Sequence, residues 1–186
     1  MKSHARVVIV GGGIMGVGLL YHLAEAGWDD CVLIEKAELT SGSTWHAAGQ
    51  CPNFTGDYNI AKIQHYSNTL YPKLEKLTGQ ATGWHGVGGI RFATTKEELD
   101  NFRRVEGIAK KVEFRMEIIG LDEIRRLNPF VNTDGVLAGA WTLDDGYVDP
   151  AGVTNAMASG AKKMGATIIR HNRVTDINLL PSGEWE

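Results

Sequence analysis

The sequence is poor in the features that would assign it to several large classes of protein. Its 186 residues include only two cysteines, and they contain no apolar run near the roughly 20 residues of a membrane-spanning helix. Two cysteines suggest no disulfide framework, so we expect a reduced compartment. The 19 basic residues nearly balance the 22 acidic ones, which gives no reason to expect nucleic acid or a membrane as a partner.

Little sequence precedes the first predicted strand, at Arg6. This leaves no room for a signal or transit peptide, so we expect a cytoplasmic protein, or one of the mitochondrial matrix if the source is eukaryotic. The chain is 43% hydrophobic and 22% charged, values that suit a globular protein rather than a disordered one.

Glycine, in contrast, is abundant, with 23 residues. The glycines cluster at Gly11–Gly18, Gly42–Gly49 and Gly83–Gly89. Because glycine adopts conformations that other residues avoid and has no side chain, such clusters indicate tight turns or the close approach of another group.

The first 35 residues have the pattern of a βαβ unit. Arg6–Val10 is continuously apolar, as expected of a central parallel strand covered on both faces. A helix is predicted over Ile14–Ala26, ending at Gly27, and a second buried strand over Cys31–Glu35. The crossover between the two strands should be right-handed.

The rest of the chain alternates between helical and strand-like patterns, after a long glycine-rich loop over 37–56 whose length indicates a functional role. Thr95 and Glu98 form a predicted capping box, and Asp149 precedes a proline as a predicted helix N-cap. Further helices are predicted over 59–77, from 95 to 108, over 122–127 and from 150 to about 164, and further strands over 88–93, 136–142, 166–170 and 174–180.

These elements predict an α/β fold, with a Rossmann-like dinucleotide-binding domain and the start of a β-rich second domain. Residues 1–82 are expected to begin the first domain, 83–145 to belong to the second, and 146–186 to return to the first. The last six residues have turn chemistry followed by what looks like the start of a strand, so we expect a truncated piece of a longer protein.

The glycines of the βαβ unit carry the first functional motif, Gly11-x-Gly13-x-x-Gly16. The first serves the tight turn, the second the approach of a pyrophosphate and the third the packing of helix against strand, and the helix N-terminus attracts the phosphates. Glu35 ends the second strand, where a ribose hydroxyl acceptor belongs; a carboxylate there favours NAD or FAD over NADP. The long loop that follows favours FAD, and the alternative is a Rossmann-like scaffold that binds no nucleotide.

Four stretches resemble the dimethylglycine and sarcosine dehydrogenases, flavoproteins of the D-amino-acid-oxidase-like superfamily. They are the fingerprint Val7–Gly18, the pair Glu35-Lys36, the string Leu39–Gly49 and the stretch Asp145–Pro150. The likeness is collinear and covers essentially the whole chain. Its most specific part is Thr-Trp-His-Ala-Ala-Gly, which ends at Gly49.

The resemblance implies that His46 is joined covalently to the 8α-methyl of FAD. It also implies further contacts with FAD: Ile14 and Met15 with the pyrophosphate, Glu35 and Lys36 with the ribose, and Val174 with the adenine. The residues of the long loop implied to contact the isoalloxazine and pyrophosphate are Gly42, Ser43, Thr44, Trp45, Ala47, Ala48, Gly49 and Gln50.

Chemistry supports the role of His46 independently. A neutral imidazole nitrogen is a nucleophile that can attack an electrophilic 8α-methylene, and the small residues Ala47, Ala48 and Gly49 let a flavin edge approach. The alternative is a loop histidine that is hydrogen-bonded to the backbone.

The resemblance further implies oxidative demethylation of an N-methylated glycine, with hydride passing from the N-methyl carbon to flavin N5. Dimethylglycine is slightly favoured over sarcosine, an electron-transfer flavoprotein is a possible electron acceptor, and tetrahydrofolate is a possible ligand only of a longer protein. Two alternatives stay open: a related amine or amino-acid oxidase with non-covalent FAD, and a non-catalytic FAD-binding fragment. No metal site is predicted. Four side chains that could contact substrate, but for which a structural role is favoured, are Tyr58, Tyr66, Arg91 and Tyr147.

Overall fold

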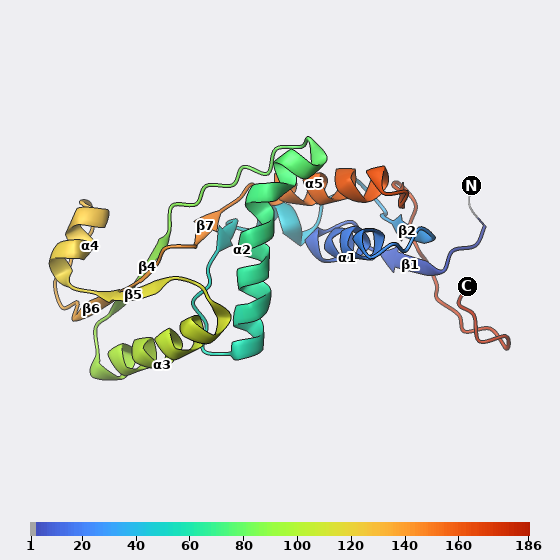
Figure 1. Cartoon of the computed structure of the whole chain (residues 1–186). Coiled ribbons are helices and arrows are strands. Elements are labelled where there is room, and N and C mark those ends of the chain that lie inside the picture. The colour runs from blue at the N-terminus through green and yellow to red at the C-terminus, as the bar shows by residue number, and fades with distance from the viewer. Residues whose placement is uncertain (1–2) are drawn as a thin grey trace. The chain divides into compact units, whose positions relative to one another are not determined.

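The structure is a computed structural model that describes residues 3–186, and the chain in it divides into two compact units (Figure 1). The first unit combines three segments of the chain: Met1–Ala48, described from residue 3, Lys73–Gly83 and Asp149–Glu186. The second combines Gly49–Pro72 and Trp84–Val148. These units are defined by which segments pack together. The predicted FAD-binding and substrate domains are defined by what they bind, so that division stays a prediction.

A parallel sheet forms the centre of the first unit. Strands β1 (Val7–Val10) and β2 (Cys31–Ile34) flank the helix α1 (Ile14–Glu25) in sequence and pair in parallel, as the βαβ pattern predicts. Strand β8 (Thr167–Ile169) then pairs in parallel with β2, giving the order β1-β2-β8. The α/β fold is therefore confirmed, and chain segments more than 130 residues apart share one sheet.

The expectation that the first strand is central and covered on both faces is wrong. β1 is an edge strand, and the side chains of Val8 and Val10 are 52% and 55% exposed while that of Ile9 between them is buried. β2 is the central strand, and its buried side chains begin at Cys31. Continuous apolarity predicted burial correctly for β2, but in β1 the period of two places alternate valines on an exposed face.

Helices α1 and α5 (Pro150–Lys163) pack tightly against each other in the first unit. A Cβ atom built at Gly160 of α5 would lie 2.7 Å from the ring of Tyr21 in α1. Glycine at this position therefore lets the two helices approach closely, and the buried Leu20 fills the neighbouring core.

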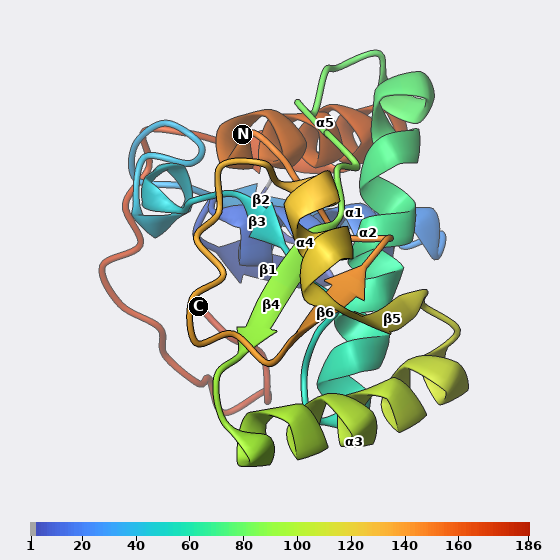
Figure 2. The same cartoon turned by 90° about the vertical axis from the view of Figure 1, so that its left-hand side faces the viewer.

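An antiparallel sheet dominates the second unit, with the order β4 (Gly89–Ala93), β6 (Ala138–Thr142), β5 (Met116–Ile119). Helices α3 (Lys96–Val112) and α4 (Leu121–Leu127) lie against this sheet (Figure 2).

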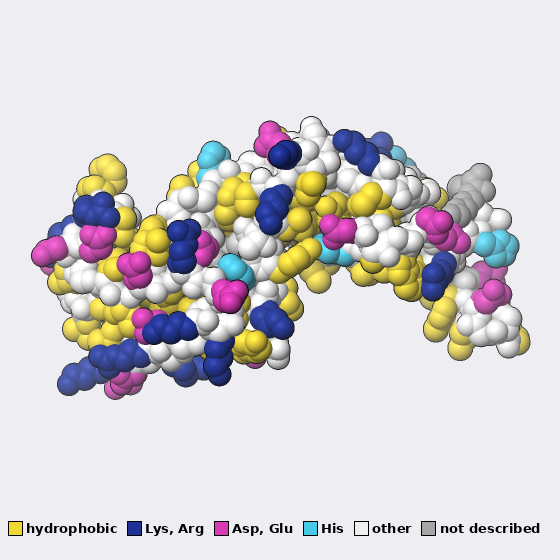
Figure 3. Space-filling model, in the orientation of Figure 1, with side chains coloured by type: hydrophobic (Ala, Val, Ile, Leu, Met, Phe, Trp, Pro, Cys, Tyr) yellow, Lys and Arg dark blue, Asp and Glu magenta, His cyan; other side chains and the backbone are white. Residues whose placement is uncertain are grey.

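The buried side chains of α3 form the core of the second unit with those of the sheet. Its core residues are Ala61, Ala93, Phe102, Val105, Ala109, Phe114, Met116 and Ala140. The opposite, solvent-facing side of α3 carries basic side chains, which gather there in Figure 3 and include Arg103, Arg104, Lys110 and Lys111. This helix therefore has the amphipathic character that its sequence predicts.

Three shorter elements lie around the predicted long loop. A 3₁₀ turn, η1 (Ser43–His46), is followed by β3 (Gln50–Cys51), which pairs with β7 (Gly146–Tyr147). The long helix α2 (Tyr58–Thr78) comes next and contributes to both units. None of the helices within residues 3–186, α2 included, is long and apolar enough to cross a membrane.

The helix caps agree with the sequence-based predictions, whereas one predicted strand does not form. Thr95 and Glu98 make the reciprocal hydrogen bonds of a capping box, and the Asp149 side chain accepts from the Ala151 amide. The stretch 174–180, predicted as a strand, has only one isolated bridge, between Leu179 and Trp185. Residues 184–186 bond to its end, with two backbone bonds between Asn178 and Glu186 and one from the Leu180 amide to the Glu184 carbonyl, and these form a short hairpin instead of a regular strand.

Candidate functional site

The glycine turn after β1 is shaped by constraints of its own backbone. Gly11 has a φ of +109°, which side-chain-bearing residues rarely adopt, and its amide donates to the Ile34 carbonyl at 2.9 Å. A Cβ atom built at Gly16 would lie 2.1 Å from the Gly11 carbonyl oxygen. The first and third glycines of the motif are thus required for the turn and for the start of α1, as the motif predicts.

The middle of the turn is packed against the long loop. A Cβ atom at Gly12 would lie 2.6 Å from the Leu39 side chain, and one at Gly13 would lie 2.9 Å from the Thr44 hydroxyl oxygen. The motif assigns Gly13 to the approach of a pyrophosphate. In the structure the absence of a side chain at Gly13 also makes room for the Thr44 hydroxyl.

The N-terminus of α1 has the properties of an anion site. Its N-cap is Gly13, which offers no side-chain hydrogen bond, and no acidic residue stands in the first turn. The Met15 side chain in this turn is 84% exposed. Unpaired amides and the helix dipole at such an end attract a phosphate group.

Glu35 is buried at the end of β2 and connects this turn to the long loop. One carboxylate oxygen accepts from the Gly12 amide at 2.6 Å, and the other accepts from the Ala37 amide at 2.8 Å. Because each carboxylate oxygen can accept more than one hydrogen bond, Glu35 keeps acceptor capacity for a ribose hydroxyl. Sequence reasoning predicted the ribose role, which stays a prediction, and missed the structural one, for which the spacing gives no signal.

The 3₁₀ turn η1 presents His46 at the surface of the first unit. Thr44 of this turn is buried, whereas Trp45 and His46 are exposed, and the rings of the last two meet edge to face with centroids 4.6 Å apart. Ala47 and Ala48, which follow, are exposed as well. An exposed imidazole next to small residues is what the predicted attachment to FAD requires.

The remaining predicted cofactor residues are spread more widely. Lys36, Gly42 and Ser43 are exposed in the first unit, and Val174 is half-buried in the irregular segment after β8. Gly49 and Gln50 belong to the second unit. There Gln50 opens β3 opposite Tyr147 of β7.

The residues of the first unit fit a dinucleotide such as FAD. Cβ atoms built at Gly11 and Gly42 would have no heavy atom within 4 Å, so the backbone is open at both places. A helix N-terminus whose own N-cap residue has no side chain, a carboxylate with acceptor capacity and an exposed imidazole accompany these openings. This combination is the one that the pyrophosphate, the ribose and the flavin ring would need.

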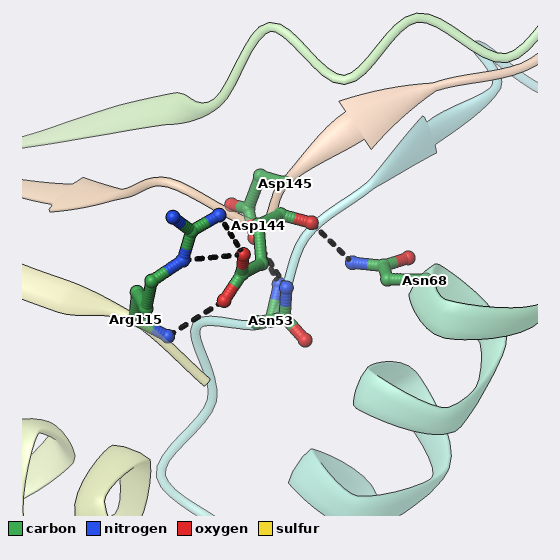
Figure 4. Close-up of polar contacts among 5 residues, drawn as sticks. All are labelled: Asn53, Asn68, Arg115, Asp144 and Asp145. Atoms are coloured by element: carbon green, nitrogen blue, oxygen red, sulfur yellow. Dashed lines mark hydrogen bonds and ion pairs between the residues drawn. The ribbon is translucent and has the colours of Figure 1, made fainter. Parts of the chain in front are cut away.

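A second polar cluster, in the second unit, contains the beginning of the stretch Asp145–Pro150 (Figure 4). Asp145 is buried, and its Oδ1 accepts from the Asn53 backbone amide at 2.7 Å and from the Asn53 side-chain amide at 2.8 Å. Its Oδ2 is bonded to the Thr142 hydroxyl. Asp145 therefore fixes the chain that follows β3, a structural role that sequence reasoning missed although Asp145 lay in the stretch that carried the family resemblance.

Asp144 and Asp145 are neighbours with opposite electrostatic environments. Burial raises the pKa of Asp145 above its ordinary value, although hydrogen bonds from Thr142 and Asn53 act in the other direction. Burial also raises the pKa of Asp144, but hydrogen bonds from Arg115 outweigh this effect and hold that pKa below its ordinary value.

A cavity of about 470 Å³ lies beside this cluster in the second unit, and its lining includes His65, Trp84 and Arg115. The Arg115 guanidinium is bound to Asp144, so it is not a ready partner for a substrate carboxylate. The nearby Cys51 thiol is not a ready nucleophile either, because burial raises its pKa to about 11.

Three of the four side chains considered as possible substrate contacts, Arg91, Tyr147 and Tyr58, lie against other side chains of the protein. The Arg91 guanidinium lies over the Phe54 ring, 4.8 Å from its centroid, and Tyr147 stacks on His85 with centroids 4.8 Å apart. Lys62 approaches the Tyr58 ring at 5.7 Å, and Tyr66 is exposed on α2. These contacts agree with the structural role that the sequence favoured for them.

Comparisons with known proteins bear directly on the cofactor. Residues 6–185 match the model of a protein family described as FAD dependent oxidoreductase. The chain is 44% identical over 185 residues to dimethylglycine dehydrogenase, mitochondrial, of Rattus norvegicus, which covers 100% of this chain and 22% of that protein. It is 34% identical over 180 residues to sarcosine dehydrogenase, mitochondrial, of Homo sapiens, which covers 96% of this chain and 20% of that protein.

Among solved structures, the fold is similar to that of L-proline dehydrogenase from P. horikoshii. The TM-score is 0.89 at 26% identity, and the match covers 97% of this chain and 48% of that chain. The chain thus spans about a fifth of the length of the two curated relatives and about half of this solved structure.

Proposed function

Because the chain belongs to the family of FAD dependent oxidoreductases, we propose that it is part of a flavoenzyme that oxidatively demethylates an N-methylated glycine and holds its FAD covalently through His46. The observation that carries this proposal is the exposed His46 on η1, beside small residues and in the same unit as the glycine turn and Glu35. The 44% identity to a dimethylglycine dehydrogenase supports the choice of substrate class.

In this proposal the protein binds and orients, and FAD, when bound, supplies the redox chemistry by accepting a hydride from the substrate's N-methyl carbon. The first turn of α1 holds the pyrophosphate, with Ile14 and Met15 beside it. Glu35 accepts a hydrogen bond from a ribose hydroxyl, and the His46 imidazole holds the flavin at its 8α carbon. The exposed Lys36 and the half-buried Val174 complete the adenosine end.

The substrate preference proposed is dimethylglycine before sarcosine. It rests on the higher identity to the dimethylglycine dehydrogenase, 44% against 34% for the sarcosine dehydrogenase. An electron-transfer flavoprotein is the proposed electron acceptor, and tetrahydrofolate would be a ligand only of a longer protein. Both similar proteins are called mitochondrial, which makes the matrix the proposed compartment in a eukaryote and the cytoplasm in a bacterium.

Covalent attachment is tested by denaturing the full-length, flavin-loaded protein with acid and measuring the flavin in the pellet together with the intact mass. We expect the mass of one FAD to stay with the wild-type protein and to be lost from His46→Ala. His4→Ala is a matched control, because His4 is also exposed and, within residues 3–186, its ring bonds to its neighbour Ser3. If all flavin moves to the supernatant in the wild type, the alternative of an oxidase with non-covalent FAD is favoured instead.

The substrate is tested by following the absorbance of the bound flavin without oxygen, after dimethylglycine, sarcosine or L-proline is added. We expect dimethylglycine to reduce the flavin fastest and proline slowest. If none of the three amines bleaches a fully loaded, folded protein, the non-catalytic alternative replaces this proposal.

A further inference from the structure

Three hydrogen bonds within the first unit hold the glycine turn and the start of α1, one to Glu35 at the end of β2 and two to the long loop. The Gly12 amide donates to Glu35 at 2.6 Å, the Thr40 amide donates to the Gly12 carbonyl at 3.0 Å, and the Ile14 amide donates to the Thr44 hydroxyl at 3.0 Å. Two of these bonds involve Gly12 in the middle of the turn. The third joins the first residue of α1 directly to η1, the turn that ends at His46.

Thr44 differs from its neighbours in burial. Its side chain is 8% exposed, whereas Ser43, Trp45 and His46 are all exposed. The Thr44 side chain therefore points into the protein while the residues on both sides face outward. Its carbonyl accepts from the Ala47 amide at 3.2 Å, a bond that closes the 3₁₀ turn around His46.

The hydroxyl of Thr44 supplies what α1 lacks at its own N-terminus. The first amides of a helix have no intrahelical acceptor, and the N-cap glycine of α1 has no side chain to offer one. Thr44 provides this acceptor from 30 residues further along the chain. The fit is close, because a Cβ atom at Gly13 would lie 2.9 Å from the same hydroxyl oxygen.

We propose that Thr44 is a positioning residue for covalent flavin attachment: its hydroxyl, bound to the Ile14 amide, seats η1 on the first turn of α1 and so fixes the place of His46. Thr44 then acts through its bond to the protein, in place of the direct contact with FAD that the family resemblance implied for this residue. This inference rests on the proposed function, since it presupposes that His46 carries the flavin.

The test compares rates of attachment in variants of the full-length apoprotein that is given saturating FAD in the presence of dissolved oxygen. In this step the bond from the His46 imidazole nitrogen to C8α replaces one C8α–H bond, the flavin takes up the two electrons, and oxygen reoxidises it. Thr44→Val keeps the shape of the side chain and removes the acceptor, and Thr44→Ser keeps the hydroxyl. Ser41→Ala removes another exposed hydroxyl of the same loop, at a residue outside the predicted FAD contacts. The readout is acid-stable flavin against time, and melting temperatures report whether each variant folds.

We expect Thr44→Val to slow attachment about tenfold or more, which corresponds to ~1.4 kcal/mol in the barrier. Thr44→Ser and Ser41→Ala should stay within about threefold of the wild type, because neither removes the bond to Ile14. In a His46→Ala background, where binding is reversible, Thr44→Val should leave the Kd for FAD within about threefold, since the hydroxyl is bound to the protein.

The outcomes separate this inference from the proposed function. No acid-stable flavin in the wild type overturns the proposed function and this inference with it. Normal attachment in Thr44→Val, or a rate restored at higher FAD together with a weakened Kd, overturns the positioning role alone. If Thr44→Val does not fold, Gly13→Ala displaces the hydroxyl without removing it and should also slow attachment; an unchanged rate there overturns the inference.

Discussion

Two glycines of α1, Gly16 and Gly18, should respond differently to substitution by alanine, because their surroundings differ. A Cβ atom at Gly16 would lie 2.1 Å from a backbone carbonyl, whereas one at Gly18 would lie 3.8 Å from the Met157 sulfur, an ordinary contact. We expect Gly16→Ala to lower the free energy of unfolding by about 2 kcal/mol or more. Gly18→Ala should leave it unchanged or raise it by up to ~1 kcal/mol, because alanine favours helix. Urea unfolding of both variants measures the difference, and equal midpoints would contradict it.

Asp145 has a second testable consequence at the residue scale. Asparagine in its place can still accept from Asn53 at Oδ1 and can donate to the Thr142 hydroxyl, which itself reaches the Gly89 carbonyl at 3.1 Å. Asp145→Asn should therefore fold, whereas Asp145→Ala leaves buried donors unpaired and should cost about 2–4 kcal/mol. Chemical denaturation of the two variants distinguishes them.

Because the pKa of Asp145 is raised, the difference in stability between the wild type and Asp145→Asn should depend on pH. A carboxyl whose folded-state pKa lies above its unfolded value binds its proton more tightly in the folded protein. The stability of the wild type relative to Asp145→Asn should therefore increase as the pH falls from the folded-state pKa towards the unfolded value. A difference in unfolding free energy that is constant with pH, or that changes in the opposite direction, contradicts this.

The role of a residue could be predicted from the sequence when the residues that constrain it are close to it along the chain. Gly11 and Gly16 are fixed by a turn of six residues, so their spacing was enough to predict their roles. The bond between Asp145 and Asn53 joins residues 92 positions apart, and no local pattern reports it. Thr44 is intermediate. Its string predicts that the loop is a cofactor site, but only the structure shows that its hydroxyl binds the Ile14 amide.

Among the secondary-structure elements, α3 has the best-defined beginning. The Thr95 hydroxyl accepts from the Glu98 amide at 3.2 Å, and the Glu98 carboxylate accepts from the Thr94 and Thr95 amides. We expect Thr95→Ala to lower stability by about 1 kcal/mol. Lys96→Ala, at an exposed position of the same first turn, should have no such cost, and thermal unfolding of the two variants checks this. Similar losses in both variants would show that the capping box is not responsible.

Caps made helices easier to predict than strands. The ends of α1, α3 and α5 are set by residues within a turn of each boundary, and all three were predicted to within a few positions. Strand β5 was missed, and the stretch 174–180 was predicted as a strand that does not form. A strand depends on a partner that lies elsewhere in the sequence, so local pattern alone is a weak guide.

At the scale of the whole molecule, FAD affinity should depend mainly on the first unit, which contains all the predicted FAD contacts except Gly49 and Gln50. Glu35→Gln replaces one carboxylate oxygen by a donor, so that it loses a bond to either Gly12 or Ala37 and an acceptor for the ribose. In a His46→Ala background we expect the Kd for FAD to rise about tenfold. Thr95→Ala, in the second unit, should destabilise without changing this Kd; titration of FAD fluorescence measures both. Equal effects of the two substitutions would contradict a site built in the first unit.

The fold class was predictable from the order of elements, whereas the grouping of segments was not. Strand, helix and strand before residue 36 predicted the α/β fold, and the family model confirms it. Ala48 and Gly49 are adjacent in sequence, yet they belong to different units. Such a division depends on which distant segments pack together, and no composition change marks it at this point.

The pairing of β8 with β2 has a consequence for how the chain folds as it is synthesised. Strand β2 ends at Ile34, but its partner over Thr167–Ile169 leaves the ribosome only after more than 130 further residues have been added, which takes roughly 7–25 s at 5–20 residues per second. The segments of the second unit are complete by Val148, so that unit can fold first. During this interval one edge of β2 is unpaired, which makes the nascent N-terminal unit a natural substrate for chaperones.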